Sequence, residues 1–307
     1  MDPFQRETPL NLQHLHYPLG FPLQLKTNSG EVLEAAEESW RERSQEFDKE
    51  PVILEVVVSG GGGGYPPPPV YRGRKHLISV VSDAENCGLS DFKRHFAYCF
   101  LSSEAVRDRS FVSYYFLEAL AKVTLTQLYL TPIHAACVAR EGKGVLLCGA
   151  SGMGKTSLAY FCTRNGWTYV SDNESWIVRD RGTLVMGNPA RIRFRENAVE
   201  LFPELMGKEP RRYWNGKMSI EITPAGATAG QCCATQVVFL RRQPEEPSTI
   251  RQLGAGEVVE RFLAELPLYE DEVRMEQTNS LWRIAALNPV ELVYSRMEDA
   301  LRLLERL

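Results

Sequence analysis

The spacing of apolar residues divides the chain into a series of expected helices and strands. Between Ser110 and Leu130 apolar side chains recur every three or four positions, which predicts a helix with a broad buried face. The polar, glutamate-rich segment from Asn28 to Phe47 also has a helical pattern, with Asn28 or Ser29 as its N-cap. Three runs of β-branched and aromatic residues predict strands at Pro51–Val58, His76–Ser82 and Phe92–Leu101.

From Ile133 onward the pattern changes to closely spaced strands and helices. Because the two parts differ, we place a domain boundary near residue 105, before the Ser110–Leu130 helix. This predicts a smaller α+β domain over residues 1–105, of unclear role, and a larger α/β domain over residues 106–307. In the second part we expect strands at His134–Arg140, Gly144–Cys148, Trp167–Ser171, Ser175–Val178, Leu184–Met186, Arg191–Phe194 and Val237–Leu240, and helices at Lys155–Asn165, Glu257–Glu265, Ser280–Leu287 and Ser295–Leu307.

One segment of unusual composition interrupts the first part. Gly60–Pro69 holds five glycines, a tyrosine and four prolines, which cannot form a helix or a central strand. We expect a mobile hairpin tip or loop, because exposed loop tips tolerate such insertions. A flap that covers a substrate is the functional alternative.

Charge and composition narrow the class of protein. The net charge of −4 and the isoelectric point of about 5.9 supply no general basic field for nucleic acid or an anionic membrane. No apolar run approaches the roughly 20 residues of a membrane span, and Met1–Glu7 lacks the basic start of a secretory signal. The seven cysteines include no CxxC pair, which favours buried reduced thiols. We therefore expect a cytoplasmic protein with neither nucleic-acid nor membrane partners.

The strongest motif in the sequence is a phosphate-binding loop of the Walker A type, GxxxxGK[ST]. It follows the apolar run Val145–Cys148 and opens a helix-compatible segment, which is the context that the motif requires. The glycines let backbone N–H groups turn toward phosphate oxygens, and the helix N-terminus adds its dipole. Lys155 would reach the β- and γ-phosphates and Thr156 would ligate Mg²⁺. The expected nucleotide-binding residues here are Gly149, Ala150, Ser151, Gly152, Met153, Gly154, Lys155, Thr156 and Ser157.

Two further residues narrow the expected reaction. Asp172 closes the apolar strand Trp167–Ser171, 17 residues after Lys155, where a carboxylate would lie near the γ-phosphate. There it would hold metal or take a proton from an attacking hydroxyl, although a strand-ending turn at Asp172-Asn173 is the alternative. His134 lies 21 residues before Lys155 at the start of a strand, where a histidine alone is more often structural.

Taken together, these segments resemble a known family. Ile133-His134-Ala135-Ala136, the loop Gly149–Thr156 and Val170-Ser171-Asp172-Asn173 look like the C-terminal catalytic domain of HPr serine kinase/phosphorylases, over roughly residues 130 to 200. The resemblance implies a mixed α/β sheet similar to that of phosphoenolpyruvate carboxykinase. It also implies transfer of the γ-phosphate of ATP to a serine hydroxyl. By residue matching, Asp172 would be the general base and His134 would assist or orient it.

The sequence also departs from this family. Asn173 stands where the family has a second aspartate, and Glu174 follows it as a further candidate metal ligand beside Thr156 and Asp172. The family's downstream glycine-rich signature E-x-R-G-L-G has no counterpart here. The first part of the chain shows no match to the family's N-terminal domain. We therefore regard the chain as a divergent relative.

The run Arg191-Ile192-Arg193-Phe194-Arg195 alternates basic and apolar residues. On a strand this places three guanidinium groups on one face. They would stabilise charge on a transferring phosphoryl group, with Arg191 and Arg193 favoured because they follow a Gly-Asn-Pro turn. A solvated strand face explains the alternation equally well.

The sequence thus predicts an ATP- and Mg²⁺-dependent kinase that acts on a serine or another hydroxyl of a protein, peptide or small molecule. A nucleotide-binding regulatory or assembly module with little or no kinase activity is the alternative. His134 and Asp172 favour the kinase, and Asn173 favours the binding module. The sequence leaves open whether the chain forms a homo-oligomer, whether GTP replaces ATP, and which molecule is the acceptor.

Overall fold

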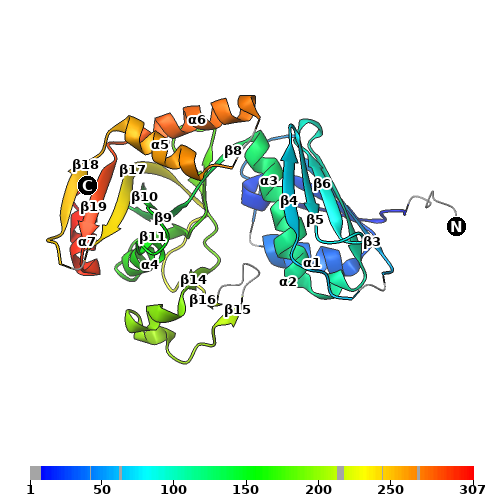
Figure 1. The fold of residues 1–307 in the computed structure, drawn as a ribbon, viewed down its shortest axis with the longest axis horizontal. Coiled ribbons are helices and arrows are strands. Elements are labelled where there is room, and N and C mark those ends of the chain that lie inside the picture. The colour runs from blue at the N-terminus through cyan, green and yellow to red at the C-terminus, as the bar shows by residue number, and fades with distance from the viewer. Residues whose placement is uncertain (1–7, 42, 62–63, 213–217, 244, 268–269) are drawn as a thin grey trace. The chain divides into compact units, whose positions relative to one another are not determined.

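The computed structural model describes residues 8–41, 43–61, 64–212, 218–243, 245–267 and 270–307 (Figure 1). The chain forms two compact units, Met1–Leu128 and Tyr129–Leu307, which we call the N-terminal and C-terminal units. Each combines helices with a sheet of mixed strand directions, so the predicted mixed α/β class is confirmed. The closer likeness to phosphoenolpyruvate carboxykinase stays a prediction.

The N-terminal unit is built on a seven-stranded sheet in the order β1-β2-β3-β7-β6-β5-β4. β3 pairs in parallel with β2 and with β7, and the other neighbours are antiparallel. The strands are β1 (Leu12–His16), β2 (Leu23–Thr27), β3 (Val52–Ser59), β4 (Val70–Arg74), β5 (Leu77–Val81), β6 (Cys87–Asp91) and β7 (Phe96–Ser102).

Helices pack against this sheet, and the structure shows where the predicted helix after Asn28 begins and ends. α1 (Gly30–Trp40) packs on β1 and β2, and α3 (Glu118–Leu128) packs on β3, β6 and β7. The predicted cap of α1 is confirmed at Ser29, whose hydroxyl accepts a hydrogen bond from the amide of Val32. The helix ends at Trp40 rather than at Phe47, and Phe47 is buried in the following segment, where it stacks on Phe21 with ring centroids 4.2 Å apart. The remaining helical elements of this unit are α2 (Arg109–Val112), the π-turn η4 (Ser113–Leu117) and the 3₁₀ turns η1 (Pro18–Gly20), η2 (Phe92–Arg94) and η3 (Ala105–Arg107).

The two units divide after the helical segment that was expected to open the second domain. The predicted boundary near residue 105 differs from the observed one between Leu128 and Tyr129. The reason is that this helical segment packs against the sheet and against α1 of the N-terminal unit. Thr124 of α3 hydrogen-bonds Ser90 of β6 at 2.7 Å between hydroxyl oxygens, and Ser113 donates to the carbonyl of Ala35 in α1.

The glycine- and proline-rich segment is not a hairpin tip. It connects β3 to β4, which lie apart in the sheet order and do not pair with each other. Tyr65 within it donates a hydrogen bond of 2.8 Å to Asp108, and its ring meets Phe111 edge-on at 5.5 Å. These contacts tie the described part of the segment to the start of α2. Gly62 and Gly63 lie outside the described residues.

The C-terminal unit contains a nine-stranded sheet with the order β11-β9-β10-β17-β13-β12-β8. The long strand β17 pairs with β10 in parallel on one side. On its other side it pairs first with β13 and then with β19, to which β18 adds an edge. The strands are β8 (Leu130–Ile133), β9 (Ala135–Arg140), β10 (Lys143–Cys148), β11 (Thr168–Ser171), β12 (Ser175–Val178), β13 (Leu184–Met186), β17 (Gln231–Arg242), β18 (Thr249–Gln252) and β19 (Val290–Tyr294).

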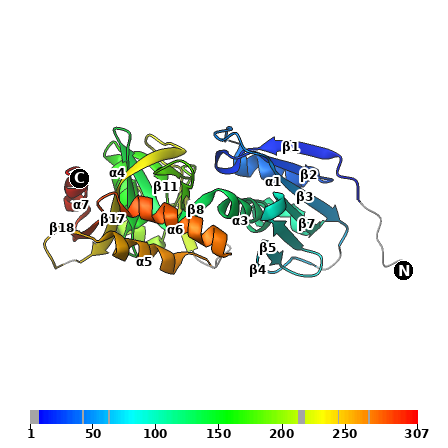
Figure 2. The same cartoon turned by 90° about the horizontal axis from the view of Figure 1, so that it is seen from above.

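Helices cover both faces of this sheet (Figure 2). In β10, Val145 and Leu147 face a core shared with α4 (Lys155–Arg164) and α7 (Met297–Leu304). Leu146 and Cys148 face a second core shared with α5 (Ala255–Glu265) and α6 (Asp271–Ala285). Burial on both faces explains why β9 and β10 read as continuous apolar runs rather than as alternating ones.

A small three-stranded sheet, in the order β14-β16-β15, completes the unit. Ile192 and Phe194 of β14 are buried in the α4 side of the core, and Arg191, Arg193 and Arg195 are exposed. The alternation predicted for this run is therefore confirmed. The strands are β14 (Ile192–Phe194), β15 (Arg211–Arg212) and β16 (Met218–Ile222), and the 3₁₀ turns η5 (Glu196–Glu200) and η6 (Pro203–Leu205) lie between β14 and β15.

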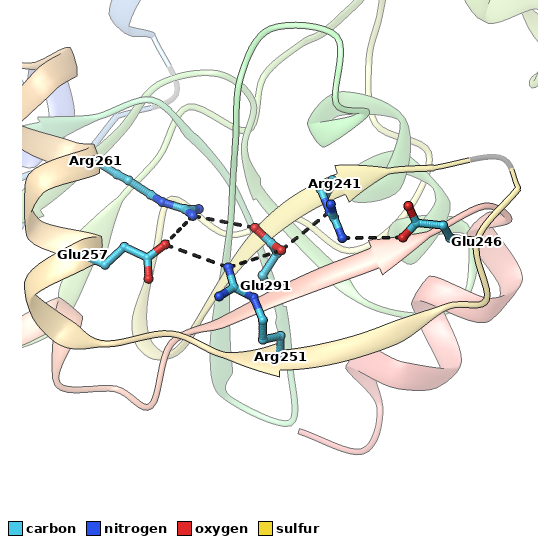
Figure 3. A network of polar contacts seen from close by, with 6 residues as sticks. All are labelled: Arg241, Glu246, Arg251, Glu257, Arg261 and Glu291. Carbon is cyan, nitrogen blue, oxygen red and sulfur yellow. Dashed lines mark hydrogen bonds and ion pairs between the residues drawn. The ribbon is translucent and has the colours of Figure 1, made fainter.

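A charge network joins the exposed edge strand β18 to the sheet (Figure 3). Its centre is Glu291 of β19, whose side chain is only 12% exposed. Three arginine side chains lie within 3.5–3.7 Å of the Glu291 carboxylate, and two further glutamates balance them. These ion pairs connect the edge strand to its neighbours. Because three arginines face three glutamates, the network leaves no surplus positive charge at this edge. Its members are Arg241, Glu246, Arg251, Glu257, Arg261 and Glu291.

Two predictions from composition are tested by this architecture. The seven cysteines are unpaired, and four of them are buried, whereas Cys233 is exposed; that the thiols stay reduced remains a prediction. Within the described ranges, the helices are all too short or too polar to cross a membrane.

Candidate functional site

The predicted phosphate loop joins β10 to α4 at one end of the central sheet. Three of its glycines have positive φ angles, 136° at Gly149, 93° at Gly152 and 89° at Gly154, which side chains resist. A Cβ at Gly149 would lie 3.0 Å from the carbonyl oxygen of Leu240, whereas one at Gly152 would meet nothing within 4 Å. The loop is therefore packed against the sheet on its inner side and open on its outer side.

The first turn of α4 is suited to bind an anion. Its N-cap is Gly154, which offers no side chain to satisfy the first amides, and the first turn contains no acidic residue. These amides have no partner inside the helix, and the helix dipole favours negative charge beside them. The structure thus provides the strand–loop–helix arrangement that the motif predicts. Ser157 lies in this turn and is partly exposed.

Lys155 is buried in the loop that it closes. Its ammonium donates to the carbonyl oxygen of Gly149 at 2.7 Å and to that of Ala150 at 3.4 Å. Burial is the main cause that lowers the pKa of Lys155, and the carboxylates of Glu265 and Asp172 oppose it. An ammonium has three donors, so two contacts to the loop leave capacity for a phosphate oxygen.

Asp172 lies against the last residue of the motif. It follows β11 directly, and its Oδ1 accepts a hydrogen bond of 2.8 Å from the hydroxyl of Thr156. Burial raises the pKa of Asp172 to about 6, against the opposing effects of the Thr156 hydroxyl, the backbone N–H of Arg193 and the charge of Lys155. A carboxylate with a pKa in this range is ionised at neutral pH and still accepts a proton readily.

Asn173 and Glu174 form the turn after this carboxylate. Asn173 has a φ of 61°, a left-handed conformation that asparagine tolerates better than most residues. The amide of Glu174 then donates to the carbonyl oxygen of Asp172 at 2.7 Å, and both side chains are exposed. The alternative that Asp172-Asn173 makes a strand-ending turn is therefore also realised, together with the Thr156 contact.

His134 is exposed between β8 and β9; the strand that was expected to begin at His134 begins one residue later, at Ala135. Its neighbour Ile133 pairs with Ser175, and β9 pairs with β11, so His134 and Asp172 lie at the same edge of neighbouring strands. Ser175 connects the strands at this edge. Its hydroxyl donates a hydrogen bond to the carbonyl oxygen of Ala135, and its hydroxyl oxygen lies 2.5 Å from the hydroxyl oxygen of Ser171. In the described part of the chain no hydrogen bond joins His134 to Asp172.

The three arginines of the basic run have different partners. Arg191 and Arg193 both bind the carboxylate of Glu221, at 3.0 Å and 2.9 Å, so that one carboxylate is shared by two guanidinium groups. Arg195 instead donates a hydrogen bond of 2.7 Å to the hydroxyl of Ser151 in the phosphate loop. The sequence favoured the first two, whereas the structure brings the third to the loop. The only sequence signal for the contact of Arg195 with the loop is the two-residue spacing of the run, which places Arg195 on the same strand face as Arg191 and Arg193.

Tyr294 is a second contact that sequence reasoning missed. It closes β19, is almost completely buried, and donates a hydrogen bond of 2.8 Å to the carbonyl oxygen of Met153. A Cβ at Gly154 would lie 2.3 Å from its hydroxyl oxygen. Tyr294 therefore holds the loop from the sheet side and makes glycine necessary at position 154. No sequence signal links residues 141 positions apart.

The side chains around Thr156 fit Mg²⁺, the ion that the resemblance implies. A hydroxyl and a carboxylate oxygen 2.8 Å apart are hard oxygen donors. Mg²⁺ in nucleotide sites is held by one or two such groups together with water and phosphate oxygens. Among the described residues no cluster of three histidine, cysteine or acidic ligands includes Asp172 or Glu174, so the protein itself offers a partial set of ligands.

Comparisons with known proteins add a distant relationship. No protein-family model matches the sequence, and no curated protein matches it. Among solved structures, the HPr(Ser) kinase/phosphatase from Coxiella burnetii is 12% identical, with a TM-score of 0.31, over 57% of this chain and 95% of that chain. A TM-score this low does not by itself establish a common fold. The chain is thus only distantly similar in structure to this kinase/phosphatase, and its function has to be inferred from the site.

Proposed function

We propose that this protein is an ATP-dependent kinase that transfers the γ-phosphate of ATP to a serine hydroxyl or another hydroxyl of a protein, peptide or small molecule. The observation that carries the proposal is the hydrogen bond between Thr156, the last residue of the phosphate loop, and Asp172. It joins a candidate phosphate site to a carboxylate able to accept a proton. The two parts of a phosphoryl-transfer reaction therefore meet at one point.

Nucleotide binding is assigned to the loop and to the start of α4. The amides of Gly149–Ser157 would surround the β- and γ-phosphates, with the ammonium of Lys155 beside them. Arg195, which already reaches Ser151, would add a second positive charge on the open side of the loop. Arg191 and Arg193 are a weaker choice for this task, because Glu221 neutralises part of their charge.

Proton removal is assigned to Asp172. Its pKa of about 6 leaves the carboxylate ionised at pH 7, and a general base with a pKa near the working pH is the most effective. His134 lies at the same sheet edge and would assist from the solvent side once an acceptor covers it. Mg²⁺, when bound by Thr156 and Asp172 or through water, would neutralise charge on the phosphates. Glu174, on the exposed turn, is the weaker candidate ligand.

A nucleotide-binding regulatory module with little or no transfer activity is the second candidate. One observation favours it: Asn173 occupies the position of the second aspartate of the resembled family and serves the backbone turn by its φ of 61°. In such a module the loop would still bind ATP, and the bound nucleotide would act on a partner protein.

Labelled phosphate transfer separates the two candidates. The full chain is incubated with γ-labelled ATP, Mg²⁺ and either a lysate or a panel of hydroxyl acceptors, and incorporation of label is compared with that of Asp172→Asn. A kinase is expected to label an acceptor, and the variant is expected to be slower by about 10²- to 10⁴-fold with ATP affinity retained. Asp271→Asn is the matched control, an exposed aspartate in α6 on the opposite face of the sheet.

Two outcomes would contradict the proposed kinase mechanism. Full transfer activity in Asp172→Asn would remove the proposed base and make Glu174 the next candidate. A wild-type chain that binds ATP but labels no acceptor would favour the regulatory module.

A further inference from the structure

Two imidazoles and a carboxylate meet in the N-terminal unit, on elements that the proposed kinase chemistry does not use. His14 and His16 are two residues apart on β1, so their side chains share one face of the strand. α1 packs on β1 and brings Glu37 to the same place. In the part of the chain that the structure describes, this is the one group of three metal-binding side chains whose ligand atoms all lie within 4.8 Å of one another.

The spacing of the ring nitrogens suits a tetrahedral metal ion. Nδ1 of His14 lies 3.2 Å from Nε2 of His16. Two nitrogens that bind one zinc ion at about 2.0–2.1 Å with tetrahedral angles are separated by about 3.4 Å. Without metal, one ring donates a hydrogen bond to the other. An ion would replace that proton with a change of only about 0.2 Å in the distance between the two nitrogens.

The surroundings of His16 prepare it for this function. The residue is 5% exposed, and its ring lies against Trp40 with centroids 5.2 Å apart, which fixes its orientation.

Glu37 supplies the negative ligand. Its side chain is 46% exposed, and its only ion-pair partner in the described structure, Arg41, lies 3.9 Å away with a side chain that is 68% exposed. Such a surface pair contributes little to stability, so the carboxylate can turn toward a metal at small cost.

We propose that His14, His16 and Glu37 form a binding site for a divalent transition-metal ion, with zinc as the ion that fits best. Two imidazole nitrogens and one carboxylate oxygen are a ligand set that zinc accepts, whereas Mg²⁺ and Ca²⁺ prefer oxygen alone. His14 and Glu37 are on the solvent side, so water completes the coordination. The ion joins β1, which stands at the end of the strand order beside β2, to the helix that packs on it. The site therefore stabilises the edge of the sheet.

Metal titration of the full-length chain without an affinity tag tests the site. After treatment with a chelator, the protein is titrated with Zn²⁺ by calorimetry and with Co²⁺ by visible absorption, with no nucleotide present. We expect one ion per chain, a tetrahedral Co²⁺ spectrum, and a melting temperature raised by about 5 °C or more at saturating Zn²⁺.

Variants of the exposed ligands identify the site without a risk of unfolding the unit. His14→Ala and Glu37→Gln are each expected to weaken Zn²⁺ binding at least tenfold and to abolish the Co²⁺ spectrum. His76→Ala, a histidine beside Asp91 and outside the group, should leave both unchanged, as should Asp172→Asn in the other unit. Wild-type binding in both His14→Ala and Glu37→Gln would place the ion elsewhere, and absence of binding at micromolar Zn²⁺ would refute the site.

Discussion

Replacing Gly154 with alanine tests the contact that holds the phosphate loop to the sheet. Gly154 has a φ of 89° and is the N-cap of α4, and the Cβ of an alanine there would lie 2.3 Å from the hydroxyl oxygen of Tyr294. Two separate penalties follow from this geometry. One comes from the left-handed backbone, and the other from the collision with a buried side chain.

The magnitudes can be worked out separately. A left-handed non-glycine residue costs about 1–2 kcal/mol, and overpacking a rigid site costs about 1–3 kcal/mol more. We therefore expect Gly154→Ala to lower the free energy of unfolding by about 2–5 kcal/mol. Tyr294→Phe removes the hydrogen bond to Met153 and is expected to cost about 0.5–1.5 kcal/mol.

The double variant separates the two penalties. The Cβ at position 154 would lie 3.6 Å from the Cζ of residue 294, an ordinary contact, so phenylalanine removes the collision and leaves only the backbone penalty. Gly154→Ala with Tyr294→Phe should therefore be more stable than the sum of the single changes by about 1–3 kcal/mol. Gly152→Ala is the matched control, because it has a φ of 93° but an added Cβ with nothing within 4 Å.

Denaturant unfolding measures these couplings. The proteins compared are the wild type, Gly154→Ala, Tyr294→Phe and their double variant, together with Gly152→Ala alone and combined with Tyr294→Phe. Midpoints are converted with a common slope, and circular dichroism and tryptophan fluorescence are compared because the chain has two units. We expect coupling for the Gly154 pair and additivity for the Gly152 pair. A coupling below about 0.5 kcal/mol at Gly154 would refute the proposed contact between the loop and Tyr294.

Three further predictions concern the residues around the loop. Lys155→Ala should abolish turnover and weaken ATP binding at least tenfold, about 1.4 kcal/mol, by calorimetry; unchanged affinity in a folded variant would exclude this loop as the site. Because burial raises the pKa of Asp172 from 3.8 to about 6, its ionisation opposes folding increasingly as the pH rises from about 4 to about 6, and fully above that range. Asp172→Asn should therefore raise the free energy of unfolding at pH 7 by up to about 3 kcal/mol, and this gain should disappear below pH 4; an equal gain at both pH values would contradict the assignment. Arg195→Ala should weaken ATP binding more than Arg191→Ala, since only Arg195 reaches Ser151; equal effects would contradict its selection over Arg191.

Local sequence patterns were sufficient wherever one segment decides its own conformation. The run Val145–Cys148, the glycines after it and the helix from Lys155 to Arg164 match the predicted strand, loop and helix within a residue. Ser29 caps α1 as expected, because a cap depends on a side chain and an amide three residues away. The alternation of Arg191–Arg195 likewise follows from the two-residue period of a strand.

Sequence patterns were insufficient where the structure depends on which element a buried helix face or a loop packs against. The apolar face of Ser110–Leu130 predicts a helix but not its partner, and its burial against β3, β6 and β7 moves the unit boundary to Leu128. A one-dimensional pattern shows that a face is buried without showing by which element. Gly60–Pro69 was expected to be a mobile hairpin tip or a loop. It is a loop between β3 and β4, and no sequence pattern indicated that its Tyr65 binds Asp108, which lies 43 residues further along the chain.

The sequence alone determined that a glycine-rich loop of the Walker A pattern lies between a buried strand and a helix, and that an aspartate follows the end of the next strand. Tertiary structure decided that Thr156 and Asp172 touch, that Arg195 rather than its neighbours reaches Ser151, and that Tyr294 holds Met153. It also decided that His14 and His16 meet Glu37 across a strand and a helix. The physical reason is that backbone conformation is set mainly by neighbours in the chain. Contacts between side chains depend on the pairing order of strands and on the packing of helices, which bring together residues far apart in the sequence.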